Sequence, residues 1–232
     1  MTKLSDYTTA RVGLGITGES LPTKALLDFR LAHARARDAV HFPLEPATLT
    51  TELLACNLMP VVLHSAAANR DEYLRRPDKG RRLNSASAQI VATHRRPTAL
   101  ILADGLSALA VHRHAIPLLK EIALDPQLPI WLVQQGRVAI GDHIGELLQA
   151  ELSIVILGER PGLTTPDSLG IYLTWHHHTG RTDAERNCIS NILTHGLSYA
   201  EAAHKLAFLT NEAKRRKLTG VPLKETAARL LE

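Results

Sequence analysis

A chain of 232 residues with 45% hydrophobic residues can bury a sizeable core, either as one large domain or as a domain with an added arm. Its formal net charge of +4 would permit nucleic-acid binding, but an aromatic content of 4% leaves few rings for bases to stack on. No apolar run approaches the roughly 20 residues that span a membrane, and the first residues lack the apolar core of a signal peptide. We therefore expect a soluble protein of the cytoplasm.

Residues 1–58 are predicted to form an N-terminal arm with one amphipathic helix. The first 19 residues are polar and Gly-rich. Pro22 suits the first turn of a helix, and Ser20 precedes it as a candidate cap. Apolar residues recur at spacings of three and four before Pro43 ends the pattern, namely Leu26, Phe29, Ala32, Ala36 and Val40.

Residues 59–232 are predicted to form a single α/β domain. Apolar runs alternate with helical patterns, which is typical of parallel strands joined by helical crossovers. The runs are 60–63, 98–103, 130–133, 152–157 and 171–175, followed by a segment at 188–193. Helices are expected at about 107–123, from Gly141 and Asp142 onward, and at about 199–217. The expected fold is a mostly parallel sheet with flanking helices (Rossmann-like) plus the N-terminal helical arm.

Two segments admit alternative functions. Gly13 to Gly18 matches G-x-G-x-x-G, with Asp38 twenty residues after its last glycine, so a stand-alone nucleotide-binding oxidoreductase is one alternative. No strong strand precedes these glycines, however, and the helix begins after them. Asn69 to Arg82 is a basic loop, which a nucleic-acid-binding module could use. Acidic residues lie between the basic ones and reduce the positive electrostatic potential of this segment. This favours a solvated face or a subunit contact over nucleic-acid binding.

The chain offers no convincing catalytic or metal-binding constellation. Ser107 lacks the glycine context of a nucleophile elbow and is better explained as a helix cap. Neighbours among His176, His177 and His178 would point to opposite faces of a strand, so they cannot all reach one metal ion. Cys56 and Cys188 lie far apart and indicate neither a disulfide framework nor a thiolate zinc site. From composition alone, Cys188 is predicted to be a small buried thiol.

The most informative stretch runs from Gly136 to Leu163. It combines a short β-branched run, a helix, a second apolar run and the turn Gly-Glu-Arg-Pro-Gly at 158–162. Ligands in α/β proteins tend to bind at loops that follow the carboxyl ends of strands. Glu159 and Arg160 on this rigid turn are therefore candidates for ligand binding, and a surface turn with an internal ion pair is the alternative.

Several runs in register together resemble the small (light) subunit of ethanolamine ammonia-lyase, an adenosylcobalamin-dependent enzyme. They cover most of the chain from about Arg11 to Gly220. The runs are Tyr73–Leu83 (Y-L-R-R-P-D-K-G-R-R-L), Asp104–Ser107 (D-G-L-S), Gly136–Val138 with Asp142–Glu146 (G-R-V and D-H-I-G-E), Gly158–Leu163 (G-E-R-P-G-L) and Arg186–Ile192 (R-N-C-I-S-N-I). Asp142 and His143 do not have the spacing of a cobalt-ligating Asp-x-His-x-x-Gly motif, so no histidine is expected to ligate cobalt.

The resemblance implies conversion of ethanolamine to acetaldehyde and ammonia, with the corrin held between this chain and a large catalytic subunit in a hetero-oligomer. By motif, the cobalamin-contacting positions fall on Val138, Glu159 and Cys188, and no catalytic residue is expected here. Neither nucleic acid nor membrane is an expected partner. One departure is Leu193, where the family carries a histidine. We expect no longer N-terminal extension of the kind that some relatives use for packaging into a bacterial microcompartment, so the cytoplasm is the expected location and a microcompartment the alternative.

Overall fold

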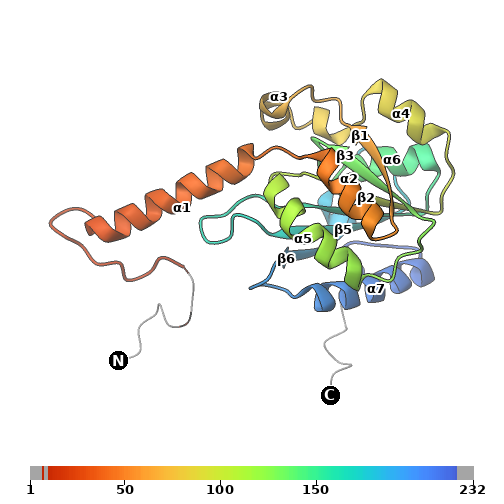
Figure 1. The fold of residues 1–232 in the computed structure, drawn as a ribbon. Helices are drawn as coiled ribbons and strands as arrows, with labels where there is room; N and C mark the ends of the chain where they lie inside the picture. Colours follow the sequence, from red (N-terminus) through yellow and green to blue (C-terminus); the bar gives the residue numbers. More distant parts are fainter. Residues whose placement is uncertain (1–6, 8–9, 224–232) are drawn as a thin grey trace, which may run out of the picture.

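A six-stranded sheet forms the centre of the molecule, with strand order β1-β3-β2-β4-β5-β6. The computed structural model describes residue 7 and residues 10–223, so most of the segment on which the signal-peptide expectation depends lies outside the described residues. Figure 1 shows helices on both sides of the sheet. The strands are β1 (Met59–His64), β2 (Thr98–Ala103), β3 (Pro129–Gln134), β4 (Leu152–Gly158), β5 (Leu169–Trp175) and β6 (Asn187–Ile192).

The first four strands run parallel to one another, and β5 and β6 are added in alternating directions. β4 pairs antiparallel with β5, and β5 pairs antiparallel with β6. The predicted α/β fold with a mostly parallel sheet is therefore confirmed. The final segment, left without an assigned structure by its pattern, is the edge strand β6.

Seven α-helices and two short 3-10 turns accompany the sheet among the described residues. They are α1 (Thr23–His41), α2 (Pro46–Ala55), α3 (Arg70–Arg75), η2 (Lys79–Arg81), α4 (Ser85–Ala92), α5 (Ala108–Glu121), α6 (Ile140–Leu148), η3 (Asp183–Glu185) and α7 (Tyr199–Arg216). The prediction of a loop over residues 69–82 is wrong, because this segment contains α3 and η2. The Asn69 side chain caps α3 by accepting a hydrogen bond from the N–H of Glu72 at 2.9 Å.

One face of the sheet is covered by α2, α5 and α7. Its core cluster has 26 buried apolar members among the described residues, and it reaches from β3 across to β6. Leu49 and Leu53 of α2 are fully buried in this cluster. Although α2 belongs to the predicted N-terminal unit, it packs on the body, and the division at residue 58 stays a prediction.

The other face is covered only in part. Here α4 packs on α6, and α6 packs on β2 and β4, so the core cluster has 14 buried apolar members among the described residues. On β5, alternate residues starting at Leu169 join the first cluster, whereas Tyr172 points to the second. No helix packs on β5 from this side within the described part of the chain, and a pocket lies there.

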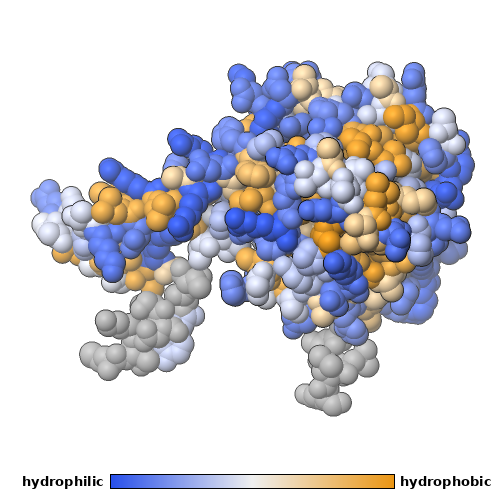
Figure 2. All heavy atoms as spheres, in the orientation of Figure 1, coloured by the Kyte–Doolittle hydropathy of each residue, from blue (hydrophilic) through white to orange (hydrophobic). Residues whose placement is uncertain are grey.

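Helix α1 projects from the body, as Figure 1 shows. The predicted helix is confirmed, but Ser20 is not its cap: the helix begins after Pro22, and Ser20 forms an isolated bridge with Thr17. Ala39 is its only buried residue. Several apolar side chains of the arm stay exposed, including Leu27, Phe29 and Leu31. Figure 2 shows orange, hydrophobic atoms along the arm. Within the described residues, no helix combines the length and apolar character needed to cross a bilayer.

Candidate functional site

A pocket lies beside α6, where the carboxyl ends of the parallel strands meet the open part of the sheet. Its volume is about 1070 Å³. The loops after β2, β3 and β4 form one wall, the exposed side of β5 forms the floor, and residues 179–186 form the opposite wall. Cofactor pockets are often found at this edge of an open α/β sheet.

Val138 lies in the loop between β3 and α6, and a buried carboxylate holds that loop in place. Asp104, at the end of β2, accepts hydrogen bonds from the N–H groups of Gln135 and Gly136, both at 2.9 Å. Complete burial raises the pKa of Asp104 to about 6, although Arg70 and the two N–H groups favour the charged form. The same loop is fixed from outside by the Tyr73 hydroxyl, which donates to the carbonyl of Gly136 at 3.1 Å.

Glycines allow the loops after β2 and β4 to lie directly against each other. A Cβ on Gly158 would sit 1.9 Å from the carbonyl oxygen of Ser107. Gly105 has a φ of +56°, and a Cβ there would sit 2.2 Å from the carbonyl oxygen of Gly158. Leu106 donates to that same carbonyl at 2.9 Å. This contact sets the position from which Glu159 enters the pocket, and Ser107 caps α5 as predicted, accepting from Ala110 at 3.3 Å.

Glu159 is half-buried and uses only one carboxylate oxygen for contacts within the chain. Its Oε2 accepts from the Ser168 hydroxyl at 2.6 Å and from the N–H of Asn191 at 3.0 Å. Its Oε1 lies above Gly170, where a Cβ would be 3.1 Å away, and it has no hydrogen bond from any described residue. Glu159 and Arg160 form no ion pair in the described part of the chain, so the alternative of an internally paired turn is wrong.

Cys188 lies on the edge strand β6, directly opposite Tyr172 of β5. It is exposed, so the expectation of a buried thiol is wrong. The cause is the position of β6 at the sheet edge, where Ile189 and Ile192 turn to the core and the residues between them do not. Tyr172 lines the pocket and contacts the Cys188 thiol, and burial raises the pKa of the Tyr172 hydroxyl. Cys188 thus adjoins the pocket through Tyr172.

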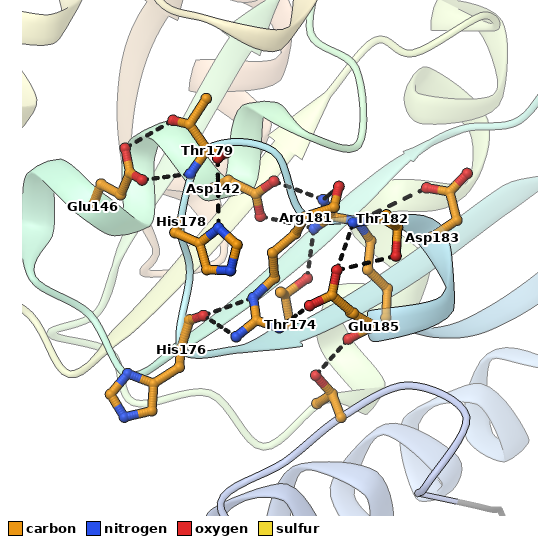
Figure 3. A network of polar contacts seen from close by, with 12 residues as sticks. Asp142, Glu146, Thr174, His176, His178, Thr179, Arg181, Thr182, Asp183 and Glu185 are labelled. Atoms are coloured by element: carbon orange, nitrogen blue, oxygen red, sulfur yellow. Dashed lines mark hydrogen bonds and ion pairs between the residues drawn. The ribbon is translucent and has the colours of Figure 1, made fainter.

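A buried ion pair between Arg186 and Asp142 forms part of the lining of the pocket, and Figure 3 labels Asp142 and its neighbours. Arg186 donates to both carboxylate oxygens of Asp142, at 2.8 and 2.6 Å, and to the Thr174 hydroxyl at 2.9 Å. The side chains of Arg186 and Asp142 are 2% and 3% exposed. This pair joins the first turn of α6 to β5 and to the loop before β6. In the same view Glu146 of α6 accepts hydrogen bonds from the backbone and hydroxyl of Thr179, which fixes the wall of the pocket.

The three consecutive histidines do not converge. His176 and His178 are exposed, whereas the His177 ring packs on Gly145 of α6, and burial lowers its pKa to about 4. No group of three His, Cys, Asp or Glu side chains that could hold a metal ion occurs among the described residues. The glycines at 13–18 lie in an irregular segment of the arm, with no strand before them in the described chain.

Sequence reasoning placed Val138 and Glu159 in one unit, and the structure brings both to the same pocket. It missed Tyr172, Asp142 and Arg186. An apolar run around Tyr172 gives no indication of which face is left uncovered. For Arg186, the only available signal was a charged residue immediately before an apolar segment, which many surface positions share.

Comparison with known proteins agrees with these features. The family described as ethanolamine ammonia-lyase light chain matches residues 1–224. The chain is 54% identical to the ethanolamine ammonia-lyase small subunit of Xanthomonas campestris pv. campestris (strain B100), over 99% of this chain and 89% of that relative. It is 52% identical to the same subunit of Ralstonia nicotianae, over 97% and 87%, and 50% identical to that of Pseudomonas fluorescens, over 97% and 86%. The chain therefore belongs to the ethanolamine ammonia-lyase small-subunit (light-chain) family.

Proposed function

We propose that this chain forms one side of an adenosylcobalamin site and that a large catalytic subunit forms the other side. The observation that carries the proposal is the convergence of Val138, Glu159 and Tyr172 on one pocket of about 1070 Å³, with Cys188 directly opposite Tyr172 on the neighbouring strand. The relatives are named small subunits, which supports a larger partner for this chain as well.

The residues present fit a corrin. Its apolar faces suit contacts with Val138 and the Tyr172 ring, while its rim of amides needs hydrogen-bond acceptors. The Oε1 atom of Glu159 is such an acceptor, because it is not used by described residues of this chain. The close approach of Gly105 and Gly158 keeps this carboxylate at a fixed height above the sheet.

When bound, adenosylcobalamin supplies the radical chemistry that converts ethanolamine to acetaldehyde and ammonia. The role of this chain is to bind and orient the group and to exclude water from one side of it. Glu159 accepts hydrogen bonds from the amide rim, and Val138 and Tyr172 cover apolar surface. No residue of this chain is proposed to act as an acid, a base or a nucleophile.

Replacing Glu159 with Gln tests this proposal in the complex with the large subunit. The amide would keep one acceptor for Ser168 or Asn191 but place an NH₂ group toward the corrin amides. A charge-assisted hydrogen bond contributes roughly 1.5 to 3 kcal/mol, so we expect the dissociation constant for adenosylcobalamin to rise about 10- to 100-fold. The affinity for ethanolamine should change less. Spectral titration of the cofactor and steady-state kinetics measure the two effects.

A matched control is Glu151→Gln, which changes an exposed carboxylate next to the opposite end of β4. It should leave the cofactor affinity unchanged. The isolated chain should bind cobalamin weakly and the complex tightly, because half an interface buries half the surface. Equal affinity with and without the large subunit would refute the shared site, and a larger effect of Glu159→Gln on ethanolamine than on cobalamin would refute the role of Glu159.

A further inference from the structure

The pocket has a strongly basic end. Arg81 and Arg82, in and just after η2, line it together with Arg137 from the loop between β3 and α6. The two segments are joined by the hydrogen bond from the N–H of Arg137 to the carbonyl of Gly80, at 2.8 Å. None of the three guanidinium groups forms an ion pair with a carboxylate among the described residues.

The neighbouring cations differ in this respect. Arg76 is bound by both oxygens of Asp78, at 3.0 and 2.9 Å, and Lys79 pairs with Glu72. Asp78 also lines the pocket, but Arg76 already occupies its carboxylate. Elsewhere in the wall, Arg181 pairs with Glu185. Arg160, beside Glu159, lines the pocket without an ion pair among the described residues. Three of the four pocket arginines that have no carboxylate partner in the described chain are therefore Arg81, Arg82 and Arg137, which lie at one end.

Arg137 gives the clearest sign that a negative group is missing. It is half-buried, with its guanidinium 4.4 Å from the centre of the Tyr73 ring and its Nη2 donating to the Tyr73 carbonyl at 2.9 Å. Its Nε is buried and has no hydrogen-bond partner. Arg70 also lies near that ring, at 4.7 Å, so two cations share one aromatic side chain. A partly buried cation without a counter-charge is costly unless a ligand provides one.

Away from η2, the pocket is lined by carboxylates as well as by arginines. Glu159 lies there with its free Oε1, and the exposed carboxylate of Asp183 lines the same side. Arg181 and Arg186 on that side are paired with Glu185 and Asp142, so the unpaired arginines gather mainly at the η2 end, and the carboxylate oxygen without a partner, Oε1 of Glu159, lies away from them. An elongated ligand with an anionic group at one extremity would bind in only one direction.

We infer that Arg81, Arg82 and Arg137 form a subsite for a phosphodiester, and that its ligand is the phosphate of the cobalamin nucleotide tail. This inference rests on the proposed function. The corrin rim carries neutral amides, which match Glu159, and the nucleotide tail carries the phosphate, which matches the arginines. The arginines therefore set the direction in which the cofactor enters, while Glu159 fixes the other end.

Comparison of two cofactor forms tests the subsite. The complex with the large subunit is titrated with adenosylcobalamin and with adenosylcobinamide, which lacks the nucleotide tail and its phosphate, and binding is measured by equilibrium dialysis. We expect adenosylcobalamin to bind about 10- to 100-fold more tightly. In Arg81→Gln/Arg82→Gln this preference should shrink to within a few-fold of unity, through weaker adenosylcobalamin binding and unchanged cobinamide binding. Arg81→Lys/Arg82→Lys should retain most of the preference.

The control is Arg75→Gln/Arg96→Gln, which removes the same charge from two exposed positions that do not line the pocket. It should leave the preference intact. The subsite is refuted if the Arg81→Gln/Arg82→Gln complex discriminates as well as the unchanged complex, or if the double substitution weakens subunit assembly without changing the preference, which would assign the arginines to an acidic surface of the partner. Failure of the unchanged complex to bind either corrinoid would instead refute the proposed function.

Discussion

The two faces of the central sheet are covered in different ways. On one face, apolar side chains of α2, α5 and α7 pack with those of strands β2 to β6 in one continuous core. On the face under α4 and α6, the apolar core stops at β4, and beyond it lie Tyr172, the Asp142–Arg186 pair and the pocket. Apolar burial stabilises the first face, whereas part of the second is held by a few directional polar contacts.

This difference explains how one small domain can provide both stability and a binding surface. Apolar packing tolerates substitutions that preserve volume, because it is not directional. A buried ion pair does not tolerate the loss of one partner, because the other charge is left without compensation. The open face should therefore be more sensitive than the closed face to single changes of charge, which Arg186→Met tests first. Two further substitutions, at His177 and Gly158, test other contacts that hold the open face.

The largest effect is expected for Arg186→Met. The substitution leaves the Asp142 carboxylate buried and unpaired, which typically costs about 3 to 5 kcal/mol. Urea denaturation followed by tryptophan fluorescence measures the free energy of unfolding. The double variant Asp142→Asn/Arg186→Met, which removes both charges, should recover part of the loss. A single-variant effect below about 1 kcal/mol would mean that the pair does not hold the open face together.

His177 should make the open face sensitive to acid. Its pKa is lowered from 6.5 to about 4 by burial against α6, with Asp142, Arg181 and Arg186 as the charged groups around it. In the unfolded chain the His177 ring therefore takes up a proton at a higher pH than it does in the folded protein. The free energy of unfolding should fall by up to about 3 kcal/mol as the pH is lowered from 6.5 toward 4.

The variant His177→Phe keeps a ring packed on Gly145 and should flatten this pH dependence. Asp104 changes the free energy of unfolding in the opposite direction, since its raised pKa of about 6 favours the folded state at low pH. Both His177→Phe and the unchanged protein contain Asp104, so its contribution cancels when the two are compared. Unfolding free energies at pH 7, 5.5 and 4.5 measure the difference. Parallel pH profiles for the two proteins would rule out His177 as the cause.

A smaller effect is expected where the two site loops touch. In Gly158→Ala the added methyl group would overlap the carbonyl of Ser107, so the loop that carries Glu159 must shift, at a cost of about 1 to 3 kcal/mol. Gly162→Ala, in the same loop, meets no atom closer than 3.5 Å and serves as the control. Thermal unfolding should separate the two variants, and equal stability would show that the loops can part freely.

The strands with strongly apolar sequences could be predicted, because burial on both faces leaves a continuous run in β2, β3 and β4. The edge strand β6 could not be assigned, since half of its residues face solvent and are polar. Short helices such as α3 and α4 were missed because fewer than nine residues show little periodicity.

The site could be predicted only where it is local in sequence. Val138 and Glu159 follow strands, so their position at the carboxyl edge follows from the α/β pattern. The pairing of Arg186 with Asp142 joins positions 44 residues apart and depends on how the segment before β6 reaches α6. The exposure of Cys188 likewise depends on strand order, which the composition of its neighbours does not encode.

The reversal of β5 determines why the pocket exists at all. A parallel fifth strand would need a crossover, which usually places a helix on one face of the sheet. Residues 159–168 instead turn the chain straight back, so no crossover helix is available to roof β5. The pocket thus exists because β5 runs antiparallel to β4, and it does not depend on particular side chains. Its lining residues can therefore change during evolution to suit different ligands while the pocket stays open.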